Sequence, residues 1–167
     1  GKPPMEDCFL AIATELIFLP LLKQMLPEIV DIHMPLEGVF HDCVMVSIKK
    51  SYPQQAKRVM HALWGMGQMM FTKMIIIVDE HVNVQDEQEV WWRVFNNIDA
   101  KRDIVMVDGH LDVLDHSSPM AKWGTKVGID ATKSWPEEGH TREWPDEIVM
   151  SDDVKKMVDE KWKDLGL

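Results

Sequence analysis

The chain has 167 residues, 46% of them hydrophobic and 28% charged, a composition typical of a globular domain with its own core. Its formal net charge of -10 argues against a nucleic-acid partner, because phosphate binding needs a basic surface. No apolar run approaches the roughly 20 residues that span a bilayer, so we expect no integral membrane segment. The two cysteines, Cys8 and Cys43, form no recognisable disulfide framework, which favours a cytoplasmic protein.

Three segments have the apolar spacing of helices. The first spans 5–25, and we expect Pro20 to kink or divide it, because proline lacks the amide proton that bonds one turn back. The second spans 54–69, and the third spans 87–97, with Asp86 as its N-cap residue. Four residues of the third helix are expected to face the core: Val90, Trp91, Val94 and Phe95.

Strand-like segments occupy 29–34, 39–50, 74–78 and 103–108. The first two are joined by a turn that is too short for a crossover, so we expect them to pair as antiparallel neighbours. Because strands and helices alternate along the chain, the sequence predicts an α/β fold, a three-layer α/β/α arrangement around a mixed sheet.

The central segment of this pattern is the run MIIIV at 74–78, which is typical of a strand buried on both faces. Lys73 precedes the run, and Asp79, Glu80 and His81 follow it. Ligands of α/β proteins bind where strands end, so both ends are candidate sites. The roles of the three residues after the strand stay open, and a solvated Lys73 without a ligand is the simpler alternative.

Residues 109–148 are rich in Gly, Pro, Ser, Asp and Trp and show little periodicity. A stretch of about 40 residues without clear elements is unusual inside a compact domain, so we expect an irregular arm that contacts a partner. Ser151 is then expected to cap a closing helix. The sequence therefore divides into an α/β core, 1–110, and an extended arm with a closing helix of the same domain, 111–167.

Large apolar side chains in the arm and the closing helix suggest subunit contacts, because aromatic residues often carry the binding energy of interfaces. The arm contains Trp123, Trp135 and Trp144. One face of the closing helix is formed by Val154, Met157, Val158, Trp162 and Leu165. We therefore expect a homo-oligomer.

Two polar clusters leave other chemistries open. His110, Asp112, Asp115 and His116 are residue types that bind divalent metals, so a metal-dependent hydrolase is one alternative and a structured loop is the other. A basic cluster would hold an anion or form a solvated face. Its members are Lys49, Lys50, Lys57 and Arg58.

Several phrases, taken together in this order and spacing, resemble the C-terminal domain of the UbiD family of decarboxylases. They are Gly1-Lys2-Pro3-Pro4, Leu26-Pro27-Glu28-Ile29-Val30-Asp31, Glu37-Gly38, Val46-Ser47-Ile48-Lys49-Lys50, Phe71-Thr72-Lys73, Val78-Asp79-Glu80, Asp115-His116-Ser117-Ser118-Pro119, and Gly128-Ile129-Asp130-Ala131-Thr132-Lys133-Ser134-Trp135-Pro136. The resemblance spans nearly the whole chain but only the last third of a typical family protein. We therefore expect an excised fragment or a processed subunit.

The resemblance implies a reversible, non-oxidative decarboxylase of aromatic or unsaturated carboxylic acids that uses prenylated flavin mononucleotide (prenylated FMN). Members of the family include decarboxylases of ubiquinone and menaquinone biosynthesis. A family lysine at the position of Lys73 contacts the phosphate side of the cofactor, so Lys73 is the one cofactor-binding residue that the resemblance implies. His81 departs from the family pattern, which often has a third acidic residue there.

The resemblance assigns no catalytic residue and no metal ligand to this chain. The family's catalytic residues, and those that bind its manganese and potassium ions, belong to upstream domains. The implied partners are those upstream domains, other copies of the chain and a small aromatic acid as substrate. This fragment alone is expected to be inactive, and an oligomerisation module without ligand contact is the remaining alternative.

Overall fold

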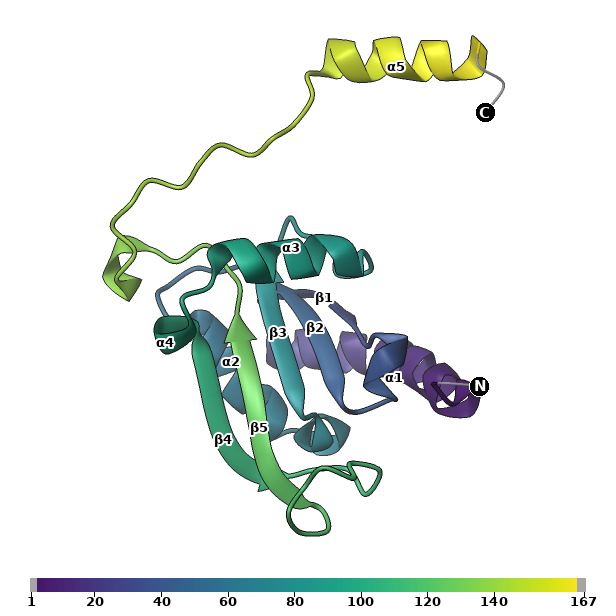
Figure 1. Ribbon diagram of the computed structural model, residues 1–167, viewed down its shortest axis with the longest axis vertical. Helices are drawn as coiled ribbons and strands as arrows, with labels where there is room; N and C mark the ends of the chain where they lie inside the picture. The colour runs from purple at the N-terminus through teal and green to yellow at the C-terminus, as the bar shows by residue number, and fades with distance from the viewer. Residues whose placement is uncertain (1–2, 165–167) are drawn as a thin grey trace.

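The computed structural model describes residues 3–164 and contains a five-stranded sheet of order β1-β2-β3-β5-β4, with helices on both faces (Figure 1). The strands are β1 Ile29–His33, β2 Cys43–Ile48, β3 Met74–Asp79, β4 Ile104–His110 and β5 Trp123–Asp130. The α-helices are α1 Met5–Met25, α2 Gln55–Trp64, α3 Glu87–Asn97, α4 Ala100–Asp103 and α5 Asp152–Asp164. Three short 3₁₀ helices are η1 Leu36–Gly38, η2 Gly67–Phe71 and η3 Pro136–Glu138. The predicted α/β class with a mixed sheet and a C-terminal helix is confirmed.

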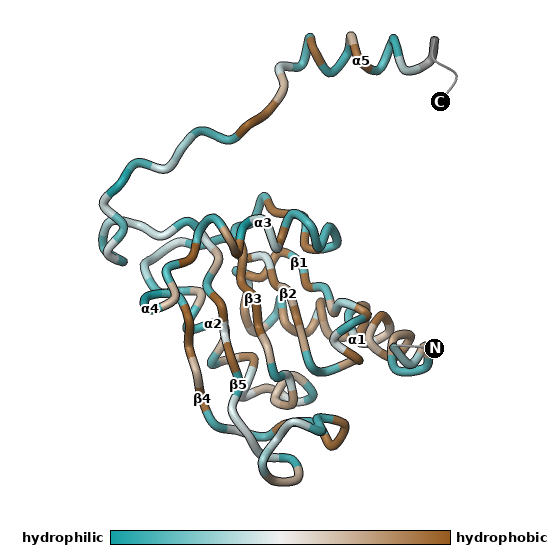
Figure 2. Tube along the Cα trace, viewed as in Figure 1, coloured by the Kyte–Doolittle hydropathy of each residue, from teal (hydrophilic) through white to brown (hydrophobic). Residues whose placement is uncertain are grey.

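Strand β3 is the centre of the sheet. It pairs in parallel with β2 on one side and with β5 on the other, whereas β1 and β4 pair antiparallel at the two edges. Figure 2 shows the hydrophobic residues concentrated along β2 and β3. Alternate residues of β3 serve the two faces: Ile75 and Ile77 pack towards α1 and α2, and Ile76 and Val78 pack towards α3. The central strand is therefore buried on both sides, as its sequence predicts.

Strand β5 corrects the expectation of an irregular arm, because it lies inside the sheet between β3 and β4. Its sequence WGTKVGID has no hydrophobic run, and its glycines have a packing role. A Cβ atom on Gly128 would lie 2.5 Å from Met60 Sδ of α2, and one on Gly124 would lie 2.8 Å from Leu111 Cδ1. The strand has glycines where close packing leaves no room for a side chain. It therefore lacks the run of β-branched residues by which a buried strand is usually identified in a sequence. The division of the domain at residue 110 stays a prediction.

The helix predicted over 54–69 is wrong in its last five residues, since α2 ends at Trp64. Gly65 follows as the C-cap residue, and Gly67 has a φ of +41°, a left-handed conformation that glycine adopts at little cost. The chain then continues as η2 and reaches the start of β3. Two glycines thus act as a helix end, although the apolar spacing continues past them.

The predicted inward face of α3 is wrong in two of its four residues. Val90 and Val94 are buried, but Trp91 is only partly covered and Phe95 is 78% exposed. The buried positions beside the two valines are Arg93 and Asn97, which lie three and seven residues after Val90 on the same helical face. Trp91 and Phe95 instead stack on each other at 6.1 Å between ring centroids. The prediction of Asp86 as the N-cap is confirmed, because its carboxylate accepts hydrogen bonds from the amides of Gln88 and Glu89.

Helix α1 runs without division through Pro20, so the expected division is wrong, whereas a kink at Pro20 stays a prediction. It is hydrophobic around its whole circumference, so it leaves a large apolar surface exposed. The exposed side chains are Met5, Phe9, Leu10, Ile12, Leu16, Ile17, Leu21 and Met25. In the part of the chain from residue 3 to 164, no helix is long and apolar enough to cross a membrane.

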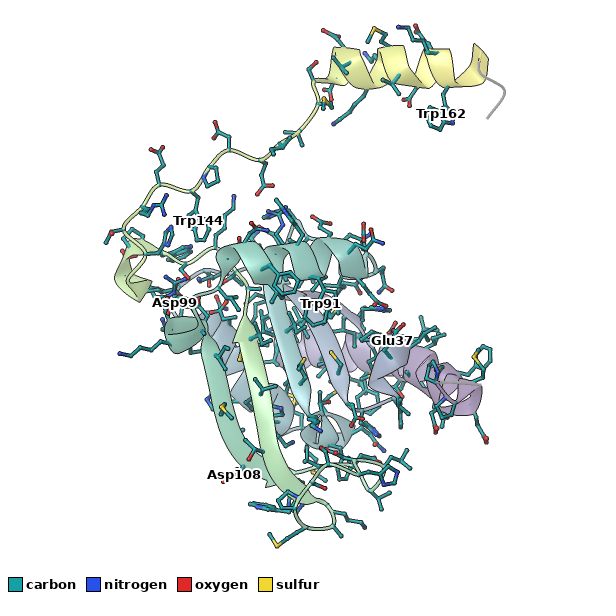
Figure 3. All side chains as sticks on the ribbon, viewed as in Figure 1. Glu37, Trp91, Asp99, Asp108, Trp144 and Trp162 are labelled. Carbon is teal, nitrogen blue, oxygen red and sulfur yellow. The ribbon has the colours of Figure 1, made fainter. Side chains whose placement is uncertain are left out.

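Helix α5 is separated from the sheet by an extended segment (Figure 1). The apolar side chains predicted to share one face of it are all exposed: Val154, Met157, Val158 and Trp162. Figure 3 shows Trp162 projecting from this helix, far from the labelled residues of the sheet domain. Leu165, assigned to the same face, and Gly1 and Lys2 of the resemblance lie outside the described residues.

Candidate functional site

Lys73 lies between η2 and β3 at the amino end of the central strand. Its backbone N–H donates to the carbonyl of His41 at 3.3 Å, and its carbonyl accepts from the amide of Val127 at 2.9 Å. The strands on both sides of β3 therefore fix the direction in which the side chain leaves the sheet. Sequence analysis placed Lys73 correctly before the strand, but it gave no partner for the ammonium group.

The partners of Lys73 are Asp115 and Ser117, from the loop between β4 and β5. Lys73 Nζ lies 3.0 Å from Asp115 Oδ2 and donates to Ser117 Oγ at 2.6 Å. The Asp115 side chain is 3% exposed and accepts two further hydrogen bonds, from the Ser117 amide at 2.9 Å and its hydroxyl at 2.7 Å. Burial raises the pKa of Asp115, but the hydrogen bonds from Ser117 and Lys73 outweigh it and keep the pKa below its usual value. Asp115 is thus an ionised carboxylate that orients the ammonium.

The ammonium of Lys73 remains accessible, since its side chain is 34% exposed. Ser117 is also exposed, but its hydroxyl hydrogen is already donated to Asp115, so the available donor is the ammonium. An ammonium suits phosphate oxygens, because an ionised donor gives the stronger, shorter hydrogen bonds. The arrangement fits the phosphate side of a flavin nucleotide in its chemistry.

Other acidic residues lie near Lys73. Asp112 Oδ2 lies 2.9 Å from Nδ1 of His41, whose side chain is buried. Burial raises the pKa of Asp42, and the negative charges of Asp115 and Asp112 raise it further, against the lowering effect of Lys73. Asp42 is therefore influenced both by the carboxylates of this loop and by the ammonium of Lys73.

The cluster from 110 to 116 does not assemble as a metal site. Asp112 faces His41 and Asp115 faces Lys73, while His110 packs edge-on against Trp123 with ring centroids 5.3 Å apart. Across residues 3–164, no three His, Cys, Asp or Glu side chains converge in a way that would hold a metal ion. The geometry favours the structured loop over the metal-dependent hydrolase.

The basic cluster of the sequence is also dispersed. Lys50 is buried against Glu138, Arg58 pairs with Glu28, and Lys57 donates to the carbonyl of Arg102. These three cations have separate partners and Lys49 is exposed, so the group does not form a common anion site.

At the carboxyl end of β3, Asp79 accepts a hydrogen bond from the amide of Lys133 at 2.8 Å. Burial raises the pKa of Asp79, and the hydrogen bond from Lys133 only partly offsets this. Glu80 is exposed, and His81 Nε2 lies 3.7 Å from Glu147 Oε1. Neither Glu80 nor His81 shares a site with Asp79. The hydrogen bond from the Lys133 amide shows that Asp79 instead holds the segment that follows β5.

The tryptophans of the arm contact their own chain. Trp144 stacks on His140 with ring centroids 4.0 Å apart and donates from its indole nitrogen to the carbonyl of Ser134 at 2.9 Å. The ammonium of Lys50 lies 5.4 Å from the ring centroid of Trp135. Trp144 thus braces the segment after β5 internally, and Trp135 contacts the sheet domain through Lys50.

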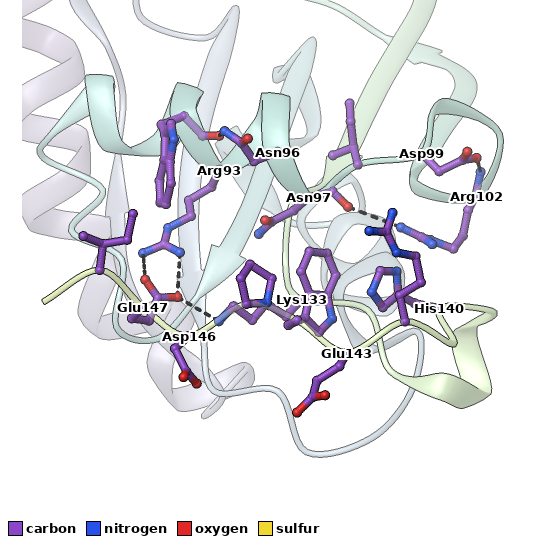
Figure 4. Close-up of a pocket in the computed structure, with 16 residues that line it drawn as sticks. Arg93, Asn96, Asn97, Asp99, Arg102, Lys133, His140, Glu143, Asp146 and Glu147 are labelled. Atoms are coloured by element: carbon purple, nitrogen blue, oxygen red, sulfur yellow. Dashed lines mark hydrogen bonds and ion pairs between the residues drawn. The ribbon is translucent and has the colours of Figure 1, made fainter.

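A cleft of about 530 Å³ lies between the end of α3, α4 and residues 140–148 (Figure 4). Arg93 crosses it to Glu147 with two hydrogen bonds, of 2.8 and 3.0 Å, and Lys133 reaches the same carboxylate at 2.8 Å. Sequence analysis missed Glu138 and Glu147 as structural partners, and also the role of Asp115 towards Lys73. In the sequence, these three residues are acidic side chains in segments without periodicity. Such residues are common on protein surfaces, so the sequence does not distinguish them as structural partners.

The comparisons with known proteins agree with this fold. Residues 8–131 match the family described as the 3-octaprenyl-4-hydroxybenzoate carboxy-lyase C-terminal domain. Uncharacterised proteins of Archaeoglobus fulgidus and Aquifex aeolicus are 51% and 52% identical over 99% and 100% of the chain. The chain spans 34% of the length of each of these relatives.

Two solved structures are similar to the chain as well. The open form of vanillic acid decarboxylase from Sedimentibacter hydroxybenzoicus is 28% identical, with a TM-score of 0.82 over 99% of this chain and 35% of that one. The UbiD-class enzyme HmfF from Pelotomaculum thermopropionicum, in complex with FMN, is 29% identical, with a TM-score of 0.69 over 83% of this chain and 31% of that one. With the family match over most of its length, the chain belongs to the UbiD family as a C-terminal domain.

Proposed function

We propose that this chain is the C-terminal domain of a cytoplasmic, non-oxidative decarboxylase that removes carbon dioxide from an aromatic or unsaturated carboxylic acid. The solved relatives support the reaction class, since they include a vanillic acid decarboxylase. The family description names a 3-octaprenyl-4-hydroxybenzoate carboxy-lyase, which supports an aromatic acid as the substrate. A role in ubiquinone or menaquinone biosynthesis is part of the proposal. The upstream domains of the same enzyme would hold the catalytic residues and the manganese and potassium ions.

The observation that carries the proposal is the geometry around Lys73. Its ammonium is held by Asp115 and Ser117 but is still open to a ligand on its exposed side. Prenylated FMN, when bound, supplies the chemistry by which carbon dioxide leaves the substrate. The part of this chain is to present the Lys73 ammonium to the cofactor phosphate, with little side-chain entropy left to lose because Asp115 has already oriented it.

A second role, subunit association, is supported by the apolar surfaces of α1 and α5. Monomers rarely leave contiguous apolar surfaces of this size exposed, and α1 is hydrophobic all round. The upstream domains and a second copy of the chain are the partners we propose for these helices. A pure oligomerisation module would share this association role. It would differ from our proposal in leaving Lys73 without a ligand.

The test is the binding of flavin to the complete enzyme that carries this domain. Replacing Lys73 with alanine removes a charge-assisted hydrogen bond of about 1.5–3 kcal/mol, so FMN affinity should fall roughly 10- to 150-fold. Riboflavin, which lacks the phosphate, should bind wild type and Lys73→Ala equally. Lys73→Arg should restore only part of the affinity, because a planar guanidinium and a compact ammonium need different space.

The control must account for Asp115, because Lys73→Ala also leaves this buried carboxylate without its cation. We expect that variant to lose about 1–3 kcal/mol of stability, which a melting curve would reveal. The double variant Lys73→Ala/Asp115→Asn removes both charges and should recover part of the stability but none of the FMN affinity. Equal FMN binding by wild type and both variants would leave Lys73 as a structural lysine.

A further inference from the structure

Residues 131–147, which we call the strap, cross the carboxyl ends of β2, β3 and β5 and lead to α5. The strap begins with two hydrogen bonds to the sheet domain: a buried one from Asn97 to the carbonyl of Ala131 at 2.8 Å, and a part-buried one from the amide of Lys133 to Asp79. Its middle is held by the pair between Lys50 and Glu138, whose side chains are 3% and 2% exposed. This first half is therefore fixed to the sheet domain.

The second half, residues 139–147, is attached differently. It lies over the cleft of about 530 Å³ instead of packing closely on α3 and α4 (Figure 4). Its ionic attachment is the carboxylate of Glu147, 35% exposed, which bridges Arg93 and Lys133. Both cations hold the pKa of Glu147 at about 2, so the carboxylate is ionised at neutral pH.

The receptor for this carboxylate is preformed. Arg93 is nearly buried on α3, stacks on Trp92 at 4.5 Å and also bonds to Glu89 at 3.3 Å. These two contacts come from α3 itself and do not involve Glu147. Arg93 therefore has partners on its own helix that hold it in place independently of Glu147.

We propose that Glu147, Arg93 and Lys133 form a releasable outer anchor, whose opening frees residues 139–147 while the pair between Lys50 and Glu138 stays closed. The residues that follow Glu147, 148–150, are strongly exposed and lead directly into α5. The closed anchor therefore fixes the point at which α5 leaves the domain, and the open anchor lengthens the reach of this helix by the freed segment. This inference rests on the proposed role of α5 in association, because a helix that must find a partner subunit needs a defined reach.

The chain contains its own probe for the open state. Arg142 lies within the freed segment. Trypsin needs several residues on both sides of a site to leave the protein surface before it can cleave, so cleavage after Arg142 reports the open anchor. Cleavage of a locally opened segment follows the population of the open form when closing is fast. The experiment uses the complete protein that carries this domain, and the mass of the fragments identifies cleavage after Arg142.

The test variant is Glu147→Gln, and the matched control is Asp146→Asn, which removes the same charge one residue earlier on the strap and leaves the residues beside Arg142 unchanged. We expect Glu147→Gln to be cleaved about fivefold faster than wild type, and Asp146→Asn to be cleaved at the wild-type rate. Raising the salt concentration should accelerate wild type and leave Glu147→Gln unchanged, because screening weakens a part-exposed ion pair. Equal cleavage rates for the two variants would refute the proposal that Glu147 anchors this segment.

The same proteins separate this inference from the association on which it rests. A protein that ends at Met150 lacks α5, and sedimentation should show smaller assemblies than for wild type. Assemblies of unchanged size would refute the association proposed above. The rates of cleavage after Arg142 test the proposed anchor whether or not the assemblies change in size.

Discussion

Lys50 and Glu138 form an ion pair that is almost completely buried, with 2.5 Å between Nζ and Oε2. Lys50 also donates to Thr132 Oγ1 at 3.1 Å, and Glu138 accepts the amide of Gln54 at 2.6 Å. These hydrogen bonds and the ammonium lower the pKa of Glu138 in spite of burial, which acts in the opposite direction. The pair closes the carboxyl edge of the sheet, where many α/β proteins bind ligands.

Breaking this pair from one side should be costly. In Lys50→Met the carboxylate of Glu138 stays buried without a cation, and we expect a loss of about 3–5 kcal/mol in the free energy of unfolding. Lys155→Met is the control, because its pair with Asp152 is exposed and should change stability by less than about 0.5 kcal/mol. Urea denaturation measures both, and equal midpoints for the two variants would contradict the assignment.

Gly128 tests the close packing of β5 on α2. In Gly128→Ala the new methyl group would meet Met60 Sδ at 2.5 Å and Trp64 Cη2 at 3.1 Å, so overpacking should cost about 1–3 kcal/mol. Gly65→Ala is the matched control, since its nearest neighbour would be at 3.5 Å and its φ of -96° suits alanine. Thermal unfolding should show a lower Tm for the first variant alone.

His33 connects the two faces of the sheet through Glu15 of α1 and Glu87 of α3, each 3.2 Å from a ring nitrogen. The hydrogen bond to Glu15 raises its pKa above 6.5, and Glu87 adds to this, while burial acts against both. A raised pKa in the folded state means that the stabilisation is complete below pH 6.5 and disappears as the pH rises through the folded value.

We therefore expect the free energy of unfolding of wild type to decrease as the pH rises above 6.5, and His33→Asn to lose this component. His116→Asn, at an exposed loop position, should keep the slope of wild type. Urea titrations at several pH values compare the three proteins. A parallel slope in His33→Asn would show that other groups cause the dependence.

Activity gives a further prediction about the chain as a part of a larger enzyme. The chain spans about a third of the length of its relatives, and we assign it no catalytic residue. The isolated 167 residues should therefore not release carbon dioxide from an aromatic acid, even when prenylated FMN is supplied. The complete enzyme under the same conditions is the positive control, and measurable turnover by the isolated chain would refute the assignment.

The sequence by itself determined the α/β class, the central strand at 74–78, the N-cap at Asp86 and the family. These features are local: burial on both faces demands an uninterrupted apolar run, and a cap needs a side chain within three residues of the helix start. The position of Lys73 before the strand was likewise readable from the order of residues along the chain.

Only the tertiary structure decided where β5 lies and which side chains meet. The bonds of Lys73 to Asp115, of Arg93 to Glu147 and of Lys50 to Glu138 join residues 42, 54 and 88 positions apart. No local period encodes such pairs, because they depend on β5 entering the sheet beside β3 and on the strap crossing its carboxyl edge. The glycines of β5 show the physical reason. Gly128 and Gly124 are needed because the side chains of Met60 and Leu111 pack against them, and both of these residues lie outside the strand.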